Sequence, residues 1–403
     1  MKKFSIPDKF RSSAISQVKD WRRINDPRKQ DFSPTTLDFG AVSFLIPRHM
    51  GFCYGVENAI EKSYKAIWEN PGKRIFLLSQ MIHNPAVNAD LESMGLRFIM
   101  DTEGHHFVQW DEINADDVVI IPAFGTTVEI EQLLQSKGVE VAKYNTTCPF
   151  VEKVWKRSAE IGKSGYSIII HGKYKHEETR ATFSHSQQNA PSVIVRDMKE
   201  AEALAKYMAP DASQAAFEQE FKGKYSPGFS IHKDLKHVGV VNQTTMLATE
   251  TQEIADYFKS IITAAFGAEY FADTRDTLCY ATNDNQDATL GVLQQGADFA
   301  IVVGGYNSSN TAQLAGILER EMPVFFIRDE SEIIDAEHIQ HFDYPNQQLK
   351  TTAGWIPSGK KPKVIITSGA SCPDTVVEAV LQKVLSFFPD AIPLEKAIEA
   401  LQA

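Results

Sequence analysis

The sequence has few cysteines, no long apolar run and no excess of positive charge, and each absence excludes a class of protein. Its four cysteines lie far apart, so they form neither a disulfide framework nor the close pairs of a structural zinc site. No apolar run reaches the ~20 residues that a membrane span needs. The net charge of −11 argues against a general nucleic-acid binder. With no signal-peptide pattern at its start, the chain is predicted to be cytoplasmic, or stromal in plastids if the source is a plant, with no membrane or nucleic-acid partner.

Positive charge is in surplus only in the first forty residues. Residues 1–40 contain nine Lys or Arg against five Asp or Glu, and little apolar periodicity precedes Leu37. We therefore predict that residues 1–40 form an extension packed on the surface of the protein.

From about Ala41, short apolar segments alternate with amphipathic ones, as strands alternate with helices. Strands that are apolar throughout are typical of parallel sheets buried on both faces, so the predicted fold class is α/β. Residues 211–234 interrupt the alternation; they are polar, contain Gly and Pro, and are predicted to be a surface loop. The expected strands are 42–46, 74–78, 118–122, 139–143, 166–170, 192–195, 238–241, 299–303, 324–327 and 363–367. The expected helices include 56–68, 84–94, 128–134, 249–266, 284–293, 373–387 and 394–401, with a further one after Pro149.

All four cysteines precede an expected helix. At a helix N-terminus the macrodipole favours a thiolate over a thiol, and only the thiolate is a good nucleophile or metal ligand. A buried, inert thiol explains any one of them as well. Ligands of an iron–sulfur cluster usually lie close together in the sequence, so the spacing alone leaves these alternatives open. The four are Cys53, Cys148, Cys279 and Cys372.

Loops rich in hydroxyl, amide and imidazole groups follow several of the expected strands. In α/β proteins, ligands bind at the carboxyl ends of strands, and helix N-termini with Ser, Thr and Asn bind anions without Lys or Arg. Ordinary helix capping explains any single loop, but the series favours a phosphate or diphosphate ligand. The loops contain His83, His171 to Glu178, Gln243 to Thr245, Asn307 to Thr311 and Ser368 to Ser371.

At these residues the sequence resembles the 4-hydroxy-3-methylbut-2-enyl diphosphate reductases, which act last in the non-mevalonate isoprenoid pathway. The resemblance covers about residues 44–381. The basic arm and the insertion are similar to the long branch of this family, which is typical of plants and cyanobacteria. The motifs are Gly51-Phe52-Cys53-Tyr54-Gly55-Val56, Ile82-His83-Asn84, Thr147-Cys148-Pro149, His176-Glu177-Glu178-Thr179, Gln243-Thr244-Thr245, Cys279-Tyr280-Ala281-Thr282, Asn307-Ser308-Ser309-Asn310 and Gly369-Ala370-Ser371.

The resemblance implies three similar α/β domains, with small and mostly parallel sheets, arranged around one central [4Fe–4S] cluster per chain. Cys53, Cys148 and Cys279 would each donate a thiolate, which leaves one iron open, and Cys372 would be a bystander. The implied boundaries are an extension at 1–40, a first domain at 41–147 with residues 41–53 near the hub, a second at 148–275 with the insertion 211–234, and a third at 276–403.

The implied reaction converts (E)-4-hydroxy-3-methylbut-2-enyl diphosphate to isopentenyl diphosphate and dimethylallyl diphosphate by reductive dehydroxylation, with two electrons and two protons. Glu178 would supply a proton so that water leaves, and Thr244 would help to hold the hydroxyl. The open iron would act as a Lewis acid. The substrate's diphosphate would be held by His83, His176, Ser308, Ser309, Asn310 and Ser371.

One residue departs from the family pattern. Many members carry a further diphosphate-binding His in an Ala-His-Gly motif, where this sequence has Ala123-Phe124-Gly125. A phenylalanine cannot donate a hydrogen bond to phosphate. His171 is a candidate to compensate for that contact.

The resemblance also implies an electron donor of the ferredoxin or flavodoxin type, and it leaves a homodimer open. Such donors are acidic, so the basic N-terminal arm is the candidate for docking. Two other functions remain open on the residues alone. One is a non-redox α/β binding protein for a phosphorylated metabolite, and the other is a transferase that uses Cys148 as nucleophile beside His176.

Overall fold

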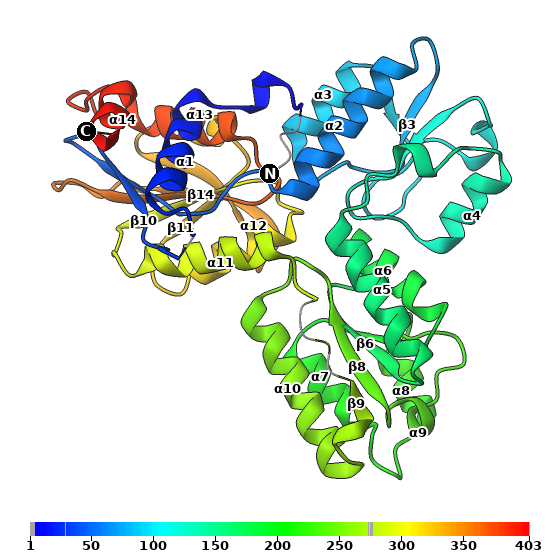
Figure 1. The fold of residues 1–403 in the computed structure, drawn as a ribbon. Helices are drawn as coiled ribbons and strands as arrows, with labels where there is room; N and C mark the ends of the chain where they lie inside the picture. Colours follow the sequence, from blue (N-terminus) through cyan, green and yellow to red (C-terminus); the bar gives the residue numbers. More distant parts are fainter. Residues whose placement is uncertain (1–4, 29, 273, 275–276, 403) are drawn as a thin grey trace. The chain divides into compact units, whose positions relative to one another are not determined.

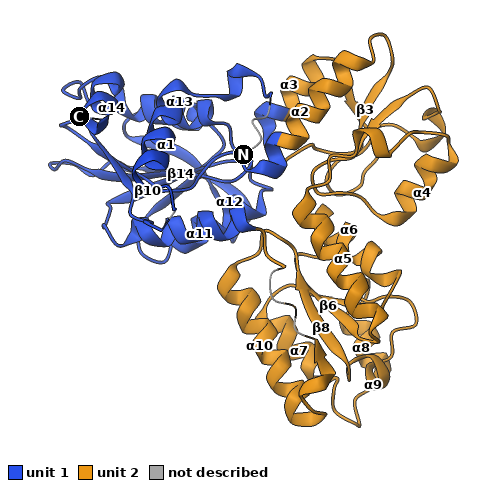
Figure 2. Ribbon diagram, viewed as in Figure 1, with its two compact units in different colours: residues 1–57, 83–87, 280–403 blue, residues 58–82, 88–279 orange. Residues whose placement is uncertain are grey.

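Strands alternate with helices along the computed structural model of the chain, as the sequence predicts (Figure 1). The structure describes residues 5–28, 30–272, 274 and 277–402, and these divide into two compact units (Figure 2). Unit 1 consists of Met1–Glu57, His83–Val87 and Tyr280–Ala403, and unit 2 consists of Asn58–Ile82 and Asn88–Cys279.

Unit 1 is built on a five-stranded sheet with the order β1-β2-β14-β10-β11. Strand β1 pairs antiparallel with β2, and the other neighbours are parallel. Parallel neighbours bring the carboxyl ends of β10 and β14 together at one edge of the sheet. The strands are β1 (Thr35–Asp38), β2 (Ser43–Ile46), β14 (Lys363–Ser368), β10 (Phe299–Val303) and β11 (Val324–Ile327).

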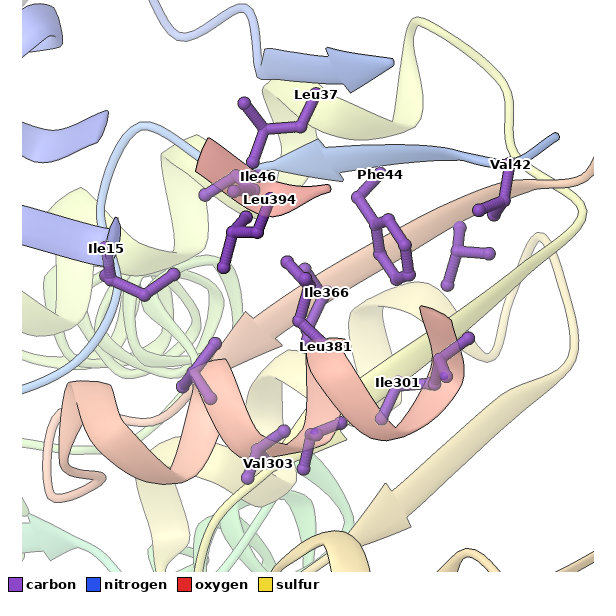
Figure 3. Close-up of a cluster of buried hydrophobic side chains, with 14 of the residues drawn as sticks. Ile15, Leu37, Val42, Phe44, Ile46, Ile301, Val303, Ile366, Leu381 and Leu394 are labelled. Atoms are coloured by element: carbon purple, nitrogen blue, oxygen red, sulfur yellow. The ribbon is translucent and has the colours of Figure 1, made fainter. Parts of the chain in front are cut away.

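Helices cover both faces of this sheet, because its strands are apolar on both sides. Ile301 and Val303 of β10 face one apolar cluster, while Ala300 and Val302 face another. Figure 3 shows the first cluster, in which strands β1, β2, β10 and β14 pack against helices from both ends of the chain. The helices are α1 (Ser13–Asn25), α11 (Tyr280–Leu293), α12 (Ser309–Leu318), α13 (Asp374–Leu385) and α14 (Leu394–Gln402).

Unit 2 contains two all-parallel sheets. One has the order β4-β3-β5, and the other has the order β7-β6-β8-β9. The first consists of β4 (Leu96–Phe98), β3 (Ile75–Leu77) and β5 (Val118–Ile120). The second consists of β7 (Ser192–Val195), β6 (Ser167–His171), β8 (Val238–Asn242) and β9 (Phe271–Ala272).

The helices of unit 2 follow the strands in chain order. Two helices, α2 (Tyr54–Glu69) and α3 (Pro85–Ser93), have residues in both units. The others are α4 (Val128–Ser136), α5 (Pro149–Lys163), α6 (Glu177–Gln187), α7 (Met198–Lys206), α8 (Gln214–Glu220), α9 (Ile231–Asp234) and α10 (Ala248–Ala265). Within the described residues, none of the helices combines the length and apolarity required to cross a bilayer.

The N-terminal arm is part of the core of unit 1, which corrects the prediction of a surface extension. Helix α1 buries Ala14, Ile15 and Val18 in the sheet's apolar cluster, and β1 adds a strand to the sheet. The strand before Cys53, β2, pairs with β14, so it belongs to the sheet of the C-terminal part of the chain. The apolar spacing of α1 is masked in the sequence by four charged residues among its thirteen, Lys19, Asp20, Arg22 and Arg23.

Three local predictions were wrong. Residues 139–143 form no strand; Val139 and Val141 pack into an apolar cluster without a ladder partner, and a 3₁₀ helix follows at Ala142–Tyr144. Residues 211–234 are not a surface loop, because α8 and α9 carry Phe217 and Ile231 into a core. Helix α11 begins at Tyr280, directly after Cys279, rather than at residue 284. A hairpin of β12 (His338–Asp343) and β13 (Gln348–Ala353) was not predicted.

Candidate functional site

The loops after β6 and β8 form the titratable part of the site, in unit 2. These strands are parallel neighbours, so both loops emerge at the same sheet edge. His176 caps α6: its Nδ1 accepts a hydrogen bond from the N–H of Glu178, at 3.2 Å. Because Nδ1 accepts, the ring proton of a neutral His176 lies on Nε2. The cap therefore fixes both the tautomer of His176 and the start of the helix that carries Glu178.

Glu178 is a buried carboxyl group held by Thr244. It is 1% exposed, and its Oε1 accepts the backbone N–H of Thr244 at 2.5 Å. Burial raises the pKa of Glu178 to about 7, while hydrogen bonds from the backbone and side chain of Thr244 oppose that shift. A carboxyl group with this pKa carries a proton near neutral pH and can still release it, which is what a general acid requires.

Gln243 joins the two loops. Its Oε1 accepts from the Thr179 hydroxyl at 3.0 Å and from the Lys173 N–H at 3.1 Å. Gly172 is required beside it, because a Cβ there would lie 2.6 Å from Oγ1 of Thr179. The contacts hold the His176–Thr179 segment against the end of β8.

Two of the candidate cysteines belong to this unit. The N–H of Cys279 donates to the carbonyl of Thr244 at 3.4 Å. Thr244 thus contacts Cys279 through its carbonyl and Glu178 through its N–H. Cys148 is the N-cap of α5, with Pro149 at the first helical position, and its N–H donates to the carbonyl of Ala123 at 2.9 Å. Both thiols are free of disulfides.

Cys53 and Cys372 belong to unit 1 and have different surroundings. Cys53 is partly exposed, and its N–H donates to the carbonyl of Ala370 at 3.2 Å. Removal of water raises the pKa of the Cys53 thiol, while the N–H groups of Val56, Gly55 and Cys53 itself act to lower it. Cys372 is fully buried in the apolar cluster, and burial raises the pKa of its thiol. Both precede helices, so position alone does not distinguish them. Cys372 lies inside the apolar cluster of unit 1, whereas Cys53 is partly exposed.

The loops after β10 and β14 form a neutral polar group in unit 1. Ser308 caps α12 by accepting the N–H of Thr311, at 3.3 Å. Asn310 accepts the N–H of Ala370 at 2.8 Å, and the Ser371 hydroxyl donates to the carbonyl of His83 at 3.3 Å. These contacts bring together five predicted diphosphate-binding residues, each at most 8% exposed: His83, Ser308, Ser309, Asn310 and Ser371.

The residue that departs from the family pattern, Phe124, packs edge-on against His176. Their ring centroids are 5.6 Å apart at 86°. His171 is fully buried, and its Nδ1 lies 3.0 Å from the hydroxyl of Thr251 on α10. Burial lowers the pKa of His171 to about 4, so the ring is neutral at pH 7. The role of His171 as a substitute diphosphate contact stays a prediction.

Sequence reasoning overlooked one polar helix face. Helix α11 follows Cys279 and buries polar side chains at helical spacing, of which Asn285 donates to Oδ1 of Asn310 at 3.4 Å. Polar residues repeating at three and four positions after a candidate cysteine are the signal that could have revealed this face. Its buried polar residues are Thr282, Asn285, Gln286 and Thr289.

Metal binding by one shared cluster remains a prediction. Within the part of the chain that the structure describes, no three or more His, Cys, Asp or Glu side chains gather as candidate metal ligands. Cys53 belongs to unit 1, whereas Cys148 and Cys279 belong to unit 2.

Comparison with known proteins gives consistent results. The model of the family described as "LytB protein" matches residues 44–385. A relative from Trichormus variabilis is 38% identical over 94% of this chain and 90% of its own. One from Gloeothece citriformis is 40% identical over 87% of this chain and 86% of its own. Both are named 4-hydroxy-3-methylbut-2-enyl diphosphate reductase.

A solved structure shares the fold. The E-1-hydroxy-2-methyl-but-2-enyl-4-diphosphate reductase from Plasmodium falciparum superposes with a TM-score of 0.60, covering 85% of this chain and 87% of its own, at 21% identity. The α/β fold class predicted from the sequence is confirmed by this likeness and by the mostly parallel sheets.

Proposed function

The chain belongs to the LytB protein family, and on that basis we propose that it is a 4-hydroxy-3-methylbut-2-enyl diphosphate reductase. It is an oxidoreductase of the non-mevalonate isoprenoid pathway, and it removes the allylic hydroxyl of its substrate with two electrons and two protons. The family relationship supports this function over a non-redox binding protein for a phosphorylated metabolite.

One observation carries the proposal in the chain's own residues: Thr244 links a candidate metal ligand to a proton donor. Its carbonyl accepts from Cys279, and its N–H donates to Glu178, whose pKa lies near 7. A binding protein has no need of a buried carboxyl group poised to give up a proton beside a cysteine.

The residues at Cys53 fit a cluster thiolate. The N–H groups of Gly55 and Val56, at the start of α2, favour negative charge on its sulfur, as donors to cluster sulfurs do. We assign Cys53, Cys148 and Cys279 as the three ligands of one [4Fe–4S] cluster, and leave Cys372 outside. When bound, this cluster supplies electrons one at a time and a Lewis-acidic iron without a thiolate.

Glu178 is assigned as the general acid. Its proton goes to the leaving oxygen of the allylic alcohol, so that water departs instead of hydroxide. Its Oε1 faces the N–H of Thr244, which orients the carboxyl group, and Thr244 is assigned to hold the substrate's hydroxyl. Burial at 1% exposure keeps water from competing for the proton.

The diphosphate is assigned to hydroxyl, amide and imidazole donors. The start of α12 presents Ser308, Ser309 and Asn310, and helix N-termini bind phosphate oxygens through their N–H groups and dipole. Ser371, His83 and His176 complete the assignment, with His176 contributing its Nε2 proton. Tight binding of the charged tail positions the carbon that reacts.

The proposed reduction requires an electron donor. An acidic one-electron carrier of the ferredoxin or flavodoxin type is the proposed electron donor, and a cytoplasmic or stromal location is compatible with it. We keep the homodimer and the domain boundaries at 148–275 and 276–403 as predictions. The first domain, predicted at 41–147, is proposed to begin after β2, because β2 pairs with β14 in the sheet of unit 1.

Anaerobic purification tests the function. The protein is expected to carry iron and sulfide and to reduce 4-hydroxy-3-methylbut-2-enyl diphosphate with a reduced viologen dye, giving two isomeric C5 diphosphates by chromatography. A protein that binds the substrate with iron absent, or one that holds iron yet forms no C5 product, would contradict it.

A further inference from the structure

Asn285 lies on the buried face of α11, and the proposed function assigns it no role. Its side chain Nδ2 lies 3.4 Å from Oδ1 of Asn310, in the first turn of α12. Asn285 is 5% exposed, so this contact is made inside unit 1, where α11 and α12 pack together.

The orientation of the Asn310 amide follows from its neighbours. The backbone N–H of Ala370 lies 2.8 Å from Oδ1 of Asn310 and can only donate, so the amide oxygen must face it. Asn285 supplies a second donor to the same oxygen. Rotation of the Asn310 amide would place its NH₂ group against both donors. The two contacts therefore keep one rotamer of Asn310 and exclude the flipped one.

This orientation leaves the Nδ2 group of Asn310 without a hydrogen-bond partner among the described residues. The nitrogen is buried, and Asn310 as a whole is 4% exposed. Buried donors are rarely left unsatisfied in native proteins, so an unused one at a candidate binding site indicates a place for a ligand acceptor. Its position at the start of α12 favours an acceptor with negative charge.

The Ala370 peptide connects this arrangement to Cys53. Its N–H donates to Asn310, and its carbonyl accepts from the N–H of Cys53 at 3.2 Å. The N–H and the carbonyl of Ala370 therefore both form hydrogen bonds, and these fix the orientation of the N–H that donates to Asn310. Asn285 adds its own donor to Asn310 from the neighbouring helix.

We propose that Asn285 is a positioning residue that holds the Asn310 amide so that its Nδ2 donates to an oxygen of the substrate's diphosphate. This inference rests on the proposed function, which supplies that diphosphate. The role belongs to the donor of Asn285, because an acceptor at this place would favour the flipped amide and turn the Asn310 oxygen toward the anion.

Three variants of the anaerobic holoenzyme separate the donor from the shape of the side chain. Asn285→Ala removes the donor, and Asn285→Asp keeps the shape but replaces the donor by a negative acceptor. Asn285→Gln keeps an amide donor. Asp287→Ala, on the exposed face of the same helix, is the matched control. For each protein we would measure the Kd of isopentenyl diphosphate by calorimetry, KM and kcat, the iron content and the Tm.

Asn285→Ala is expected to raise Kd and KM by about 5- to 10-fold with kcat nearly unchanged, as for loss of one hydrogen bond. Asn285→Asp should raise both further, Asn285→Gln should recover most of the affinity, and Asp287→Ala should bind normally. Wild-type affinity in both the Ala and Asp variants would overturn the inference. So would an equal loss in all three variants that follows the Tm, because that is a packing effect. A wild-type protein that binds no diphosphate would overturn the proposed function and, with it, this premise.

Discussion

The strand pair β6/β8 in unit 2 and the strand pair β10/β14 in unit 1 are built alike and present different chemistry. Each pair is parallel and almost wholly buried, and each sends two loops from one sheet edge into helix starts. The loops of the first pair carry an imidazole and a carboxyl group, those of His176 and Glu178. The loops of the second pair carry the hydroxyl and amide groups of Ser308, Asn310 and Ser371.

Burial has opposite consequences for the two sets of side chains. A buried carboxyl group loses solvation of its charged form, so its pKa rises and it becomes a proton donor near pH 7. Buried hydroxyl and amide groups keep their protons and become fixed donors, pre-oriented for an anion. The same backbone arrangement therefore serves proton transfer in one unit and charge binding in the other.

The largest effect is expected from removal of a cysteine assigned to the cluster, tested once in each unit. Cys53→Ser and Cys279→Ser should lose bound iron and nearly all turnover, since an alkoxide is a poor ligand for an iron–sulfur cluster. Iron analysis and visible absorption measure this loss. Cys372→Ser is the control, because its thiol is buried in an apolar cluster. Should Cys372→Ser lose its iron while Cys53→Ser keeps it, the ligand assignment is wrong.

Glu178→Gln is expected to separate proton transfer from binding. The amide keeps the shape and can accept the N–H of Thr244, but it supplies no proton, so kcat should fall by about 100- to 10,000-fold. Iron content and the Kd of isopentenyl diphosphate should stay near those of the wild type. Glu177→Gln is the matched control, because Glu177 is also buried and accepts the hydroxyl of Ser79. Near-normal turnover of Glu178→Gln would remove Glu178 from the role of acid.

Asn310→Ala tests the other side of the comparison. Loss of a hydrogen bond to a charged oxygen should raise KM by about 10- to 100-fold and leave the pH profile of kcat unchanged. Steady-state kinetics across pH would measure both. A fall in kcat at unchanged KM would show that this loop belongs to the chemistry and not to binding.

The regular parts of both units were predictable from the sequence, because buried strands such as β6 and β10 are continuous apolar runs. Their partners were not, since pairing depends on residues far apart: β2 joins β14 across most of the chain. Helix α1 was missed because charged side chains interrupt its apolar face. The spacing of Val139 and Val141 is typical of a strand, but both side chains are buried in an apolar cluster without strand pairing of this segment.

The candidate site was predictable as a set of residue types, whereas its geometry was not. The sequence indicates that Glu178 is important, but its burial and its contact with Thr244 come from the pairing of β6 with β8. The raised pKa depends on that burial. The role of Asn285 could not be predicted from the sequence, because its partner Asn310 lies on another helix and their contact depends on the packing of the two helices.

The smallest expected effect is the pH dependence that Glu178 imposes. Turnover requires its protonated form, so with a pKa of about 7, kcat/KM should fall about fivefold between pH 7 and pH 8. The folded chain binds this proton more tightly than an unfolded one, whose pKa is near 4.5, so the free energy of unfolding should decrease as pH rises from 4.5 to 7. The decrease is at most about 3 kcal/mol, and denaturant titration measures it. In Glu178→Gln the dependence assigned to this group should vanish, whereas in Asn310→Ala it should persist; its persistence in Glu178→Gln would place the titrating group elsewhere.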